Sequence, residues 1–584
     1  MEKQIESLMK ISGIEITDTE REILEEELQV FLQYAQIIDK APDYQRKEIL
    51  DDSQLMVEDN VTPWPNVDKI LKNAPALKEN SYLVPPQQSR SKEELKPCDE
   101  SSDNDWEVVI GLEVHAQLCT SSKLFCRCST KFGNTANVNT CPVCTGQPGA
   151  LPVLNKEAVR LAMLAGLAMN CEINTKSVFV RKNYFYPDSP KSYQISQFEQ
   201  SLCSGGFLTI EDELGNNRDI HLNRIQLEED AGKMIHVGAA GIWGAQASAV
   251  DFNRTSIPLI EIVSEPDMST AYEAKEYMIM LRTILVSMGI CDGNMEQGSL
   301  RCDANVSLRK KGDLELGVRA EVKNLNSFKA IERAIEYEIK RQAHILKNGE
   351  HVEQQTRLWD DNKQKTFMMR TKEDSHDYRY FSDPDLQPLC ITKEWINSLR
   401  KELPQMPLER KRQFIKFGLS QKEATYLMHN CNYADYFVSV FDLYSSAKTI
   451  SNWFFSEILS YVNSQAFIHI TAQDFSCFLQ TIDRGEISGK IGKQVIKDAF
   501  HDNKGLMQII EEKQLRQIND EKIITSIVER VLSENEKQVT LFRGGKTTIF
   551  GYFVGQTMKI SKGKANPSIV NKILREKLRC VDTS

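Results

Sequence analysis

The stretch WEVVIGLEVHAQLCTSSKLFCRCSTKFGNTANVNTCPVCTGQPGALPVLN, residues 106–155, decides the fold of this chain. Its first part, VVIGLEVHAQL, alternates apolar and polar residues as a half-buried strand does. In such a strand Glu113 and His115, two residues apart, leave the backbone on the same face. A carboxylate and an imidazole that point into one pocket can hold a divalent cation. A strand with a solvated polar face accounts for the same spacing equally well.

Four cysteines follow this predicted strand. Cys126 and Cys128 form a Cys-x-Cys pair, Cys141 and Cys144 form a Cys-x-x-Cys pair, and a short loop rich in Asn and Thr separates the two pairs. Two close thiol pairs of this kind can place four sulfur atoms around a zinc ion. The alternative is four free thiols that pack as small apolar residues in a reduced interior. The pattern favours zinc over free thiols. Such a zinc would be structural, because four protein ligands leave no open position on the metal for chemistry.

Length and composition limit the classes of protein that need to be considered. At 584 residues the chain is too long for one hydrophobic core and should form about three or four domains. It shows no signal peptide and no apolar run long enough to span a bilayer, and its 14 cysteines show no disulfide-scaffold pattern. We therefore expect a cytoplasmic protein without membrane contact. The net charge of −10 implies that any contact with nucleic acid is a local patch.

The order of sequence patterns predicts an α+β protein in five parts. Residues 1–86 read as a small helical plus extended adaptor, with a capping box at Thr17 to Glu20 and an apolar helix face that a partner chain must cover. Residues 87–105 are a polar, acidic linker. Residues 106–395 mix strands and helices and predict a large cradle domain with an antiparallel sheet. Residues 396–505 predict an all-α domain, and residues 506–584 a helical tail domain.

Several polar segments of the predicted cradle domain combine acids with Arg or Lys. They are QLEEDAGK, DFNRTSIPLIEIVSEPD, NMEQGSLRCDAN and RKNYFYPD. Carboxylates that hold Mg²⁺ beside cations that neutralise phosphate suit a pocket for a metal-bound nucleotide. Solvated surface charge is the alternative for each segment taken alone.

The C-terminal tail is strongly basic. Residues 541–584 carry nine Lys and Arg against two acids. We expect a small helical module here to present a basic face to an RNA backbone, formed by Lys546, Lys559, Lys562, Lys564, Lys572, Arg575, Lys577 and Arg579. A helix whose lysines serve only solubility is the alternative, and the scarcity of acids speaks against it.

The chain resembles GatB, a component of the tRNA-dependent Asp/Glu amidotransferase. The blocks that carry the resemblance span residues 106–584: GLEVHAQL, CPVCTGQPGALPVLNKEAV, RKNYFYPD, YQISQFEQ, LEEDAGK, DFNRTSIPLIEIVSEPD, GSLRCDANVSL, EVKNLNSF, DSHDYRYFSDPD and VGQTMKISKGKANPSIVN. Residues 1–86 resemble GatC, another component of the same enzyme, in NVTPWP and LKNAPALKENSYLVPPQ. The resemblance thus implies a fusion of GatC to GatB.

The resemblance implies an activity, cofactors and partners. The family uses ATP and Mg²⁺ to phosphorylate the side-chain carboxylate of mischarged Glu-tRNA(Gln) or Asp-tRNA(Asn), and ammonia from a separate glutaminase chain (GatA) then displaces phosphate in a heteromeric complex. It implies zinc at Cys126, Cys128, Cys141 and Cys144. For the reaction it implies Glu113, His115, Glu229 and Asp303 as catalytic and magnesium-binding residues, Lys182 as a phosphate contact, and Glu228, Glu261 and Arg301 as cofactor contacts.

Two other functions compete with this one. The chain could be a tRNA-binding scaffold without chemistry, in which zinc and acids are structural. The occurrence of four metal-capable groups in the family's blocks argues against a scaffold. A self-sufficient amidotransferase would need a nucleophile and base for glutamine hydrolysis, and no Gly- and Ser-rich amidase segment is found.

Overall fold

The computed structural model describes residues 56–61, 77–78, 81–84, 105–238, 245–371, 377–462, 468–561 and 564–578. Every described element belongs to residues 55–584, the second of the two units into which the chain divides. The predicted helix near residues 17–38, the linker at 87–104, Lys562 and Arg579 lie outside the described residues.

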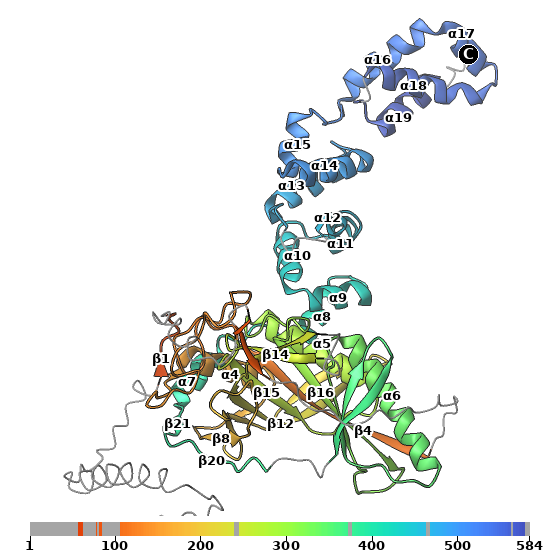
Figure 1. Ribbon diagram of the computed structural model, residues 1–584. Coiled ribbons are helices and arrows are strands. Elements are labelled where there is room, and N and C mark those ends of the chain that lie inside the picture. Colours follow the sequence, from red (N-terminus) through yellow and green to blue (C-terminus); the bar gives the residue numbers. More distant parts are fainter. Residues whose placement is uncertain are drawn as a thin grey trace, which may run out of the picture. The chain divides into compact units, whose positions relative to one another are not determined.

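The cradle domain is built on a mixed sheet of ten strands with β4 near its middle (Figure 1). The strands follow one another in the order β19-β18-β17-β16-β4-β15-β12-β10-β6, and β11 pairs with β12 beside this path. These pairs are antiparallel except β17 with β18. The strands of this sheet are β4 Trp106–Gln117, β6 Glu172–Ile173, β10 Cys203–Ser204, β11 Phe207–Glu211, β12 Asn217–Glu229, β15 Pro258–Ser264, β16 Leu300–Lys310, β17 Ala320–Lys323, β18 Gln355–Asp360 and β19 Lys365–Thr371.

Strand β4 has one apolar and one polar face, as its alternating sequence predicts. Leu112, Val114 and Ala116 are fully buried, whereas Glu113 and His115 are only partly covered. Three long helices contribute to the core on the apolar side: α4 Lys156–Ala168, α5 Ala271–Ser287 and α6 Phe328–Lys347. They begin at side-chain caps on Asn155, Thr270 and Ser327. The polar face is thereby left for a functional site.

Shorter strands form four smaller sheets. β8 Phe179–Asn183 pairs with β9 Tyr193–Gln197 and with β20 Phe381–Ser382, so the RKNY and YRYF segments become neighbours. The other short strands are β1 Met56–Val57, β2 Leu77–Lys78, β3 Ser81–Val84, β5 Leu154–Asn155, β7 Lys176–Ser177, β13 Lys233–Gly238, β14 Ala245–Asp251 and β21 Leu389–Cys390.

An extended arm before the cradle domain, described at residues 56–61, 77–78 and 81–84, contributes strands β1, β2 and β3 to two of these small sheets. Met56 and Val57 pair in parallel with Leu154 and Asn155, and β3 pairs with β14. Asp59 accepts hydrogen bonds from the backbone N–H groups of Ser121 and Ser122 and from the side chain of Asn155. The described part of the arm therefore contacts the cradle of its own chain.

The described residues after the cradle domain are helical, as predicted, and hold two further cores. The first core runs from Phe414 to Ile510 and the second from Ile524 to Leu578. The α+β fold class is confirmed, and the boundaries at residues 395 and 505 stay predictions. The helices are α7 Lys393–Arg400, α8 Pro407–Lys416, α9 Gln421–His429, α10 Cys431–Leu443, α11 Ala447–Trp453, η4 Phe454–Ile458, α12 Leu459–Val462, α13 Ala472–Asp483, α14 Gly489–Asp502, α15 Leu506–Glu512, α16 Glu521–Glu534, α17 Glu536–Arg543, η5 Thr547–Ile549, α18 Phe550–Ile560 and α19 Pro567–Leu578. Among the described helices, none combines the length and apolarity that crossing a bilayer requires.

Candidate functional site

The register of the central strands places polar residues in rows across one face of the sheet. Glu261 on β15 and Arg301 on β16 lie opposite His115 on either side. Asp303 lies opposite Glu113 in the next row. Because residues opposite each other in antiparallel strands project to the same face, segments far apart in sequence supply one site.

Three side chains on this face form a group that could hold a cation. The ligand atoms of His115, Glu228 and Glu261 all lie within 4.8 Å of one another. His115 Nε2 is 3.4 Å from Glu228 Oε1, and Ser196 Oγ donates a hydrogen bond of 3.0 Å to Glu228 Oε2. The Gln226 side chain donates to Glu261. We call His115, Glu228 and Glu261 the acid cluster.

Burial shifts the pKa of each group in the acid cluster toward its uncharged form. Burial, reinforced by Glu261, raises the pKa of Glu228 to about 8. Burial also raises the pKa of Glu261, against the opposing effect of Lys182. Burial, together with the charge of Arg301, lowers the pKa of His115 to about 3, so the imidazole is neutral. Two carboxylates and a neutral imidazole are a donor set that Mg²⁺ or Mn²⁺ fits, and such a cation would supply positive charge there.

Two cations predicted from the sequence lie around the acid cluster. Burial alone would lower the pKa of Lys182, but Glu228 and Glu261 raise it. The Lys182 ammonium also lies 5.0 Å from the centre of the Tyr378 ring. Arg301 is held by Asp230 at 2.9 Å, although its Nε is buried without a hydrogen-bond partner.

Two acids of the predicted magnesium set have other partners. Glu229 accepts a hydrogen bond from Lys191 and another of 2.9 Å from the backbone N–H of Ile195, and it is not part of the acid cluster. Asp303 is paired with Lys323 at 2.6 Å. Glu228, predicted only as a cofactor contact, takes the place in the cluster that was expected for Glu229.

A cavity of about 540 Å³ opens beside Glu113 on the same face of the sheet. Its lining includes Glu113, Arg224, Asn305 and Arg319, and Asn305 donates a hydrogen bond of 2.9 Å to Glu113. A Cβ atom at Gly317, in the cavity wall, would lie only 1.9 Å from Leu308 O, so this wall needs glycine. The volume is within the usual range for small-molecule pockets.

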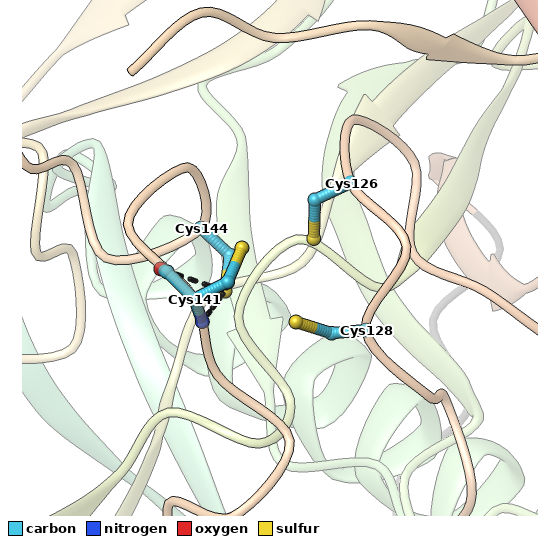
Figure 2. A group of neighbouring side chains, drawn as sticks. All are labelled: Cys126, Cys128, Cys141 and Cys144. Atoms are coloured by element: carbon cyan, nitrogen blue, oxygen red, sulfur yellow. Dashed lines mark hydrogen bonds between the residues drawn. The ribbon is translucent and has the colours of Figure 1, made fainter. Parts of the chain in front are cut away.

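The four predicted zinc ligands come together as expected. Figure 2 shows that the sulfur atoms of Cys126, Cys128, Cys141 and Cys144 point toward one another from two loops. They lie within 4.8 Å of one another, none forms a disulfide, and the Cys141 and Cys144 sulfurs are 3.8 Å apart. Tetrahedral Zn–S bonds of about 2.3 Å imply sulfur separations of about 3.8 Å, so the four-cysteine cluster fits zinc.

The four-cysteine cluster has a buried lysine beside it that sequence reasoning missed. Lys123 is fully buried, and its Nζ lies 3.6 Å from Cys144 Sγ and 3.2 Å from the Phe252 carbonyl oxygen. Hydrogen bonds from the other three cysteines lower the pKa of Cys144, and Lys123 lowers it too. The sequence signal for Lys123 was its position in SSKLFC, three residues before the first of the four cysteines.

The tail lysines fall into two kinds. Lys546 and Lys559 are exposed and Lys564 is half-buried. On α19, Lys572 and Lys577 instead form ion pairs with Glu521 and Glu529 of α16. The tail is therefore less uniformly basic in space than in sequence, because α16 supplies acids to it.

The chain is similar to known proteins over most of its length. Residues 108–397 match the family model described as the GatB/GatE catalytic domain, and residues 435–578 match the model described as the GatB domain. The B subunit of the aspartyl/glutamyl-tRNA(Asn/Gln) amidotransferase from Geobacter sp. (strain M21) is 50% identical over 480 residues, which cover 81% of this chain and 99% of the relative. That from Geotalea daltonii is 48% identical over 480 residues, 81% of this chain and 100% of the relative. That from Persephonella marina is 46% identical over 481 residues, 81% of this chain and 100% of the relative. On these matches, the chain belongs to the GatB family of amidotransferase components.

Proposed function

We propose that this chain acts as the GatB component of a tRNA-dependent amidotransferase and converts mischarged Glu-tRNA(Gln), Asp-tRNA(Asn) or both to the amidated forms. The γ-phosphoryl group of ATP passes to the side-chain carboxylate, which yields an acyl phosphate and ADP. Ammonia then attacks the acyl carbon, phosphate leaves, and the amide remains after loss of a proton. Activation is needed because the carboxylate itself has no adequate leaving group.

The acid cluster is the observation that carries this proposal. Its carboxylates, Glu228 buried and Glu261 partly buried, are only partly balanced by Lys182, and a protein that merely bound tRNA would gain nothing from them. Glu228, Glu261 and His115 would hold Mg²⁺, which when bound would neutralise charge on the transferring phosphoryl group. Lys182 would add a fixed positive charge beside the same group. The scaffold alternative is not favoured for this reason.

The cavity beside Glu113 is our candidate for the nucleotide. Glu113 lines this cavity and lies two residues from His115 on the same face of β4, so a nucleotide there would direct its phosphates toward the acid cluster. Arg224 and Arg319 supply positive charge to the cavity wall. Asp303 and Glu229 would act indirectly, because each is occupied by a lysine.

The other components of the proposal concern zinc and partners. The four-cysteine cluster would hold a structural Zn²⁺ that fixes the two loops and takes no part in the reaction. Ammonia would come from a separate, GatA-like glutaminase chain in a heteromeric complex. The tail domain would hold the tRNA through Lys546, Lys559, Lys562 and Lys564. Residues 1–86 would act as the GatC-like adaptor of the complex.

The test is ATP hydrolysis and amide formation by the assembled complex with Glu-tRNA(Gln). We expect Glu113→Gln and Glu228→Gln to lower both rates about 100-fold or more, because each removes charge at the proposed phosphoryl site. Glu107→Gln is the matched control, since Glu107 lies on the same strand but pairs with Arg309 at its far end. Normal ATP turnover by Glu113→Gln and Glu228→Gln would exclude the kinase role.

A further inference from the structure

Four aromatic rings contact one another in a row beside the acid cluster, two of the contacts edge-to-face and one stacked. The ring of Tyr184 contacts that of Tyr378 at 6.4 Å between centroids, Tyr378 contacts Tyr380 at 6.1 Å, and Tyr380 stacks on Phe198 at 4.6 Å with the planes 5° apart. Phe198 and Tyr380 remain 43% and 37% exposed although they stack on each other. We call Tyr184, Phe198, Tyr378 and Tyr380 the aromatic platform.

The backbone holds the platform in place. Asn183 donates hydrogen bonds to the carbonyl oxygens of Tyr378, at 3.0 Å from its backbone N–H, and of Arg379, at 2.8 Å from its side chain. Strand pairing sets Phe381 opposite Arg181, and Arg181 is bonded to Asp383 at 2.8 Å. Exposed aromatic side chains on a fixed backbone form a binding surface at little cost in entropy.

Two cations give the platform a positive character. The Arg224 guanidinium lies 6.0 Å from the centre of the Phe198 ring, and the Lys182 ammonium lies 5.0 Å from that of Tyr378. Glu228 and Glu261 of the acid cluster raise the pKa of the same Lys182. The Tyr378 end of the platform therefore lies next to the acid cluster. Arg224 lines the cavity as well. Rings for stacking with interspersed cations are the combination that binds single-stranded nucleic acid.

We infer that the aromatic platform binds the unpaired 3′ end of the aminoacyl-tRNA by stacking with its bases. This inference rests on the proposed function, because the amino acid is esterified to the last nucleotide and must reach the acid cluster. Bases on the platform would bring that nucleotide to the edge of the cluster. The adenine of ATP is the less suitable occupant of the platform. A single base needs only one ring to stack on, and the cavity at Glu113 is large enough to enclose the adenine.

The experiment measures equilibrium binding of two tRNAs to the assembled complex, one complete and one trimmed of its 3′ CCA. We expect Tyr380→Ala and Phe198→Ala to weaken binding of the complete tRNA about 5- to 100-fold, the usual effect of losing one or more base stacks. Removing the 3′ CCA from the tRNA should weaken its binding to the wild-type protein by a similar factor. Removing it should have little further effect on binding to either variant, because the trimming and the substitution remove the same contact. The KM for ATP should not change.

Two variants control for fold and for chemistry. Phe367→Ala removes another partly buried ring that lies under a lysine, 4.9 Å from Lys363, but on strand β19 at the sheet edge, and it should bind both tRNAs as wild type does. Tyr380→Phe keeps the ring and should also bind as wild type does.

Three results would overturn the inference. They are a trimming effect that persists in Tyr380→Ala and Phe198→Ala, a raised KM for ATP with unchanged tRNA affinity, and a Tyr380→Phe variant as weak as Tyr380→Ala. Because the readout is binding, a complex that binds tRNA through the platform yet forms no amide would refute the proposed function and leave this inference standing.

Discussion

Glu228 and Glu229 are adjacent acids with different surroundings. Glu228 belongs to the acid cluster, whereas Glu229 is occupied by Lys191 and by the backbone of Ile195. Strand alternation predicts that the two side chains leave β12 in opposite directions. The pairing of β12 with β15 sets Gln226 opposite Glu261, and Glu228, two residues further along β12, leaves on the same face as Gln226. The sequence alone does not give this pairing, so it does not say which of the two acids shares a face with His115.

The raised pKa of Glu228 predicts how cation binding depends on pH. The ordinary pKa of 4.5 is raised to about 8, so below pH 8 a proton occupies the carboxyl group and must leave before a cation can bind. Without nucleotide, we expect the affinity for Mn²⁺ to rise about tenfold per pH unit up to about pH 8 and then to level off. Electron paramagnetic resonance of free Mn²⁺ between pH 6 and 9 measures this.

The adjacent acid provides the control for this pH dependence. Glu228→Gln should abolish both the tight binding and its pH dependence, whereas Glu229→Gln should keep the slope. Equal losses in the two variants would instead support Glu229 as a magnesium ligand.

At the scale of elements, the local patterns predicted the structure well. The strand at β4 and the four-cysteine cluster both follow from alternation or spacing within short segments of the chain. Contacts that join distant segments were not predictable in this way. Tyr378 reaches Lys182 only because β20 pairs with β8, and nothing in either segment alone specifies this pairing. The site was therefore predicted in its residue types and only partly in its partners.

The two cysteine-bearing loops should depend on their metal. We expect Cys144→Ser, or chelation of zinc, to increase protease cleavage within residues 120–150 before ATP turnover falls, because the cluster would fix these loops and not the acid cluster. Limited proteolysis followed by mass spectrometry locates the cuts. Cys119→Ser is the matched control, since Cys119 is an exposed free thiol just before the first loop. Identical cleavage of the two variants would argue against a zinc site.

At the scale of the whole molecule, the tail domain should provide affinity for tRNA that depends on salt. We expect replacement of Lys559 and Lys564 by Gln to weaken tRNA binding and to reduce the slope of log affinity against log salt by about 1.5, because two phosphate contacts are lost. The same change at Lys572 and Lys577 should have a smaller effect, since those charges already face Glu521 and Glu529. Binding measured from about 50 to about 200 mM salt tests this, and equal slopes for the two double variants would contradict it.

The arm that pairs β1 with β5 has a consequence for assembly. Its described attachment to the cradle consists of two short strand pairings, β1 with β5 and β3 with β14, and of the hydrogen bonds of Asp59. These contacts involve far fewer residues than the roughly 20 to 30 on each side of a standard protein–protein interface. A covalent tether raises the local concentration of such a segment to the millimolar range, where a weak contact suffices. Because the arm and the cradle belong to one chain, they are always present in equal number.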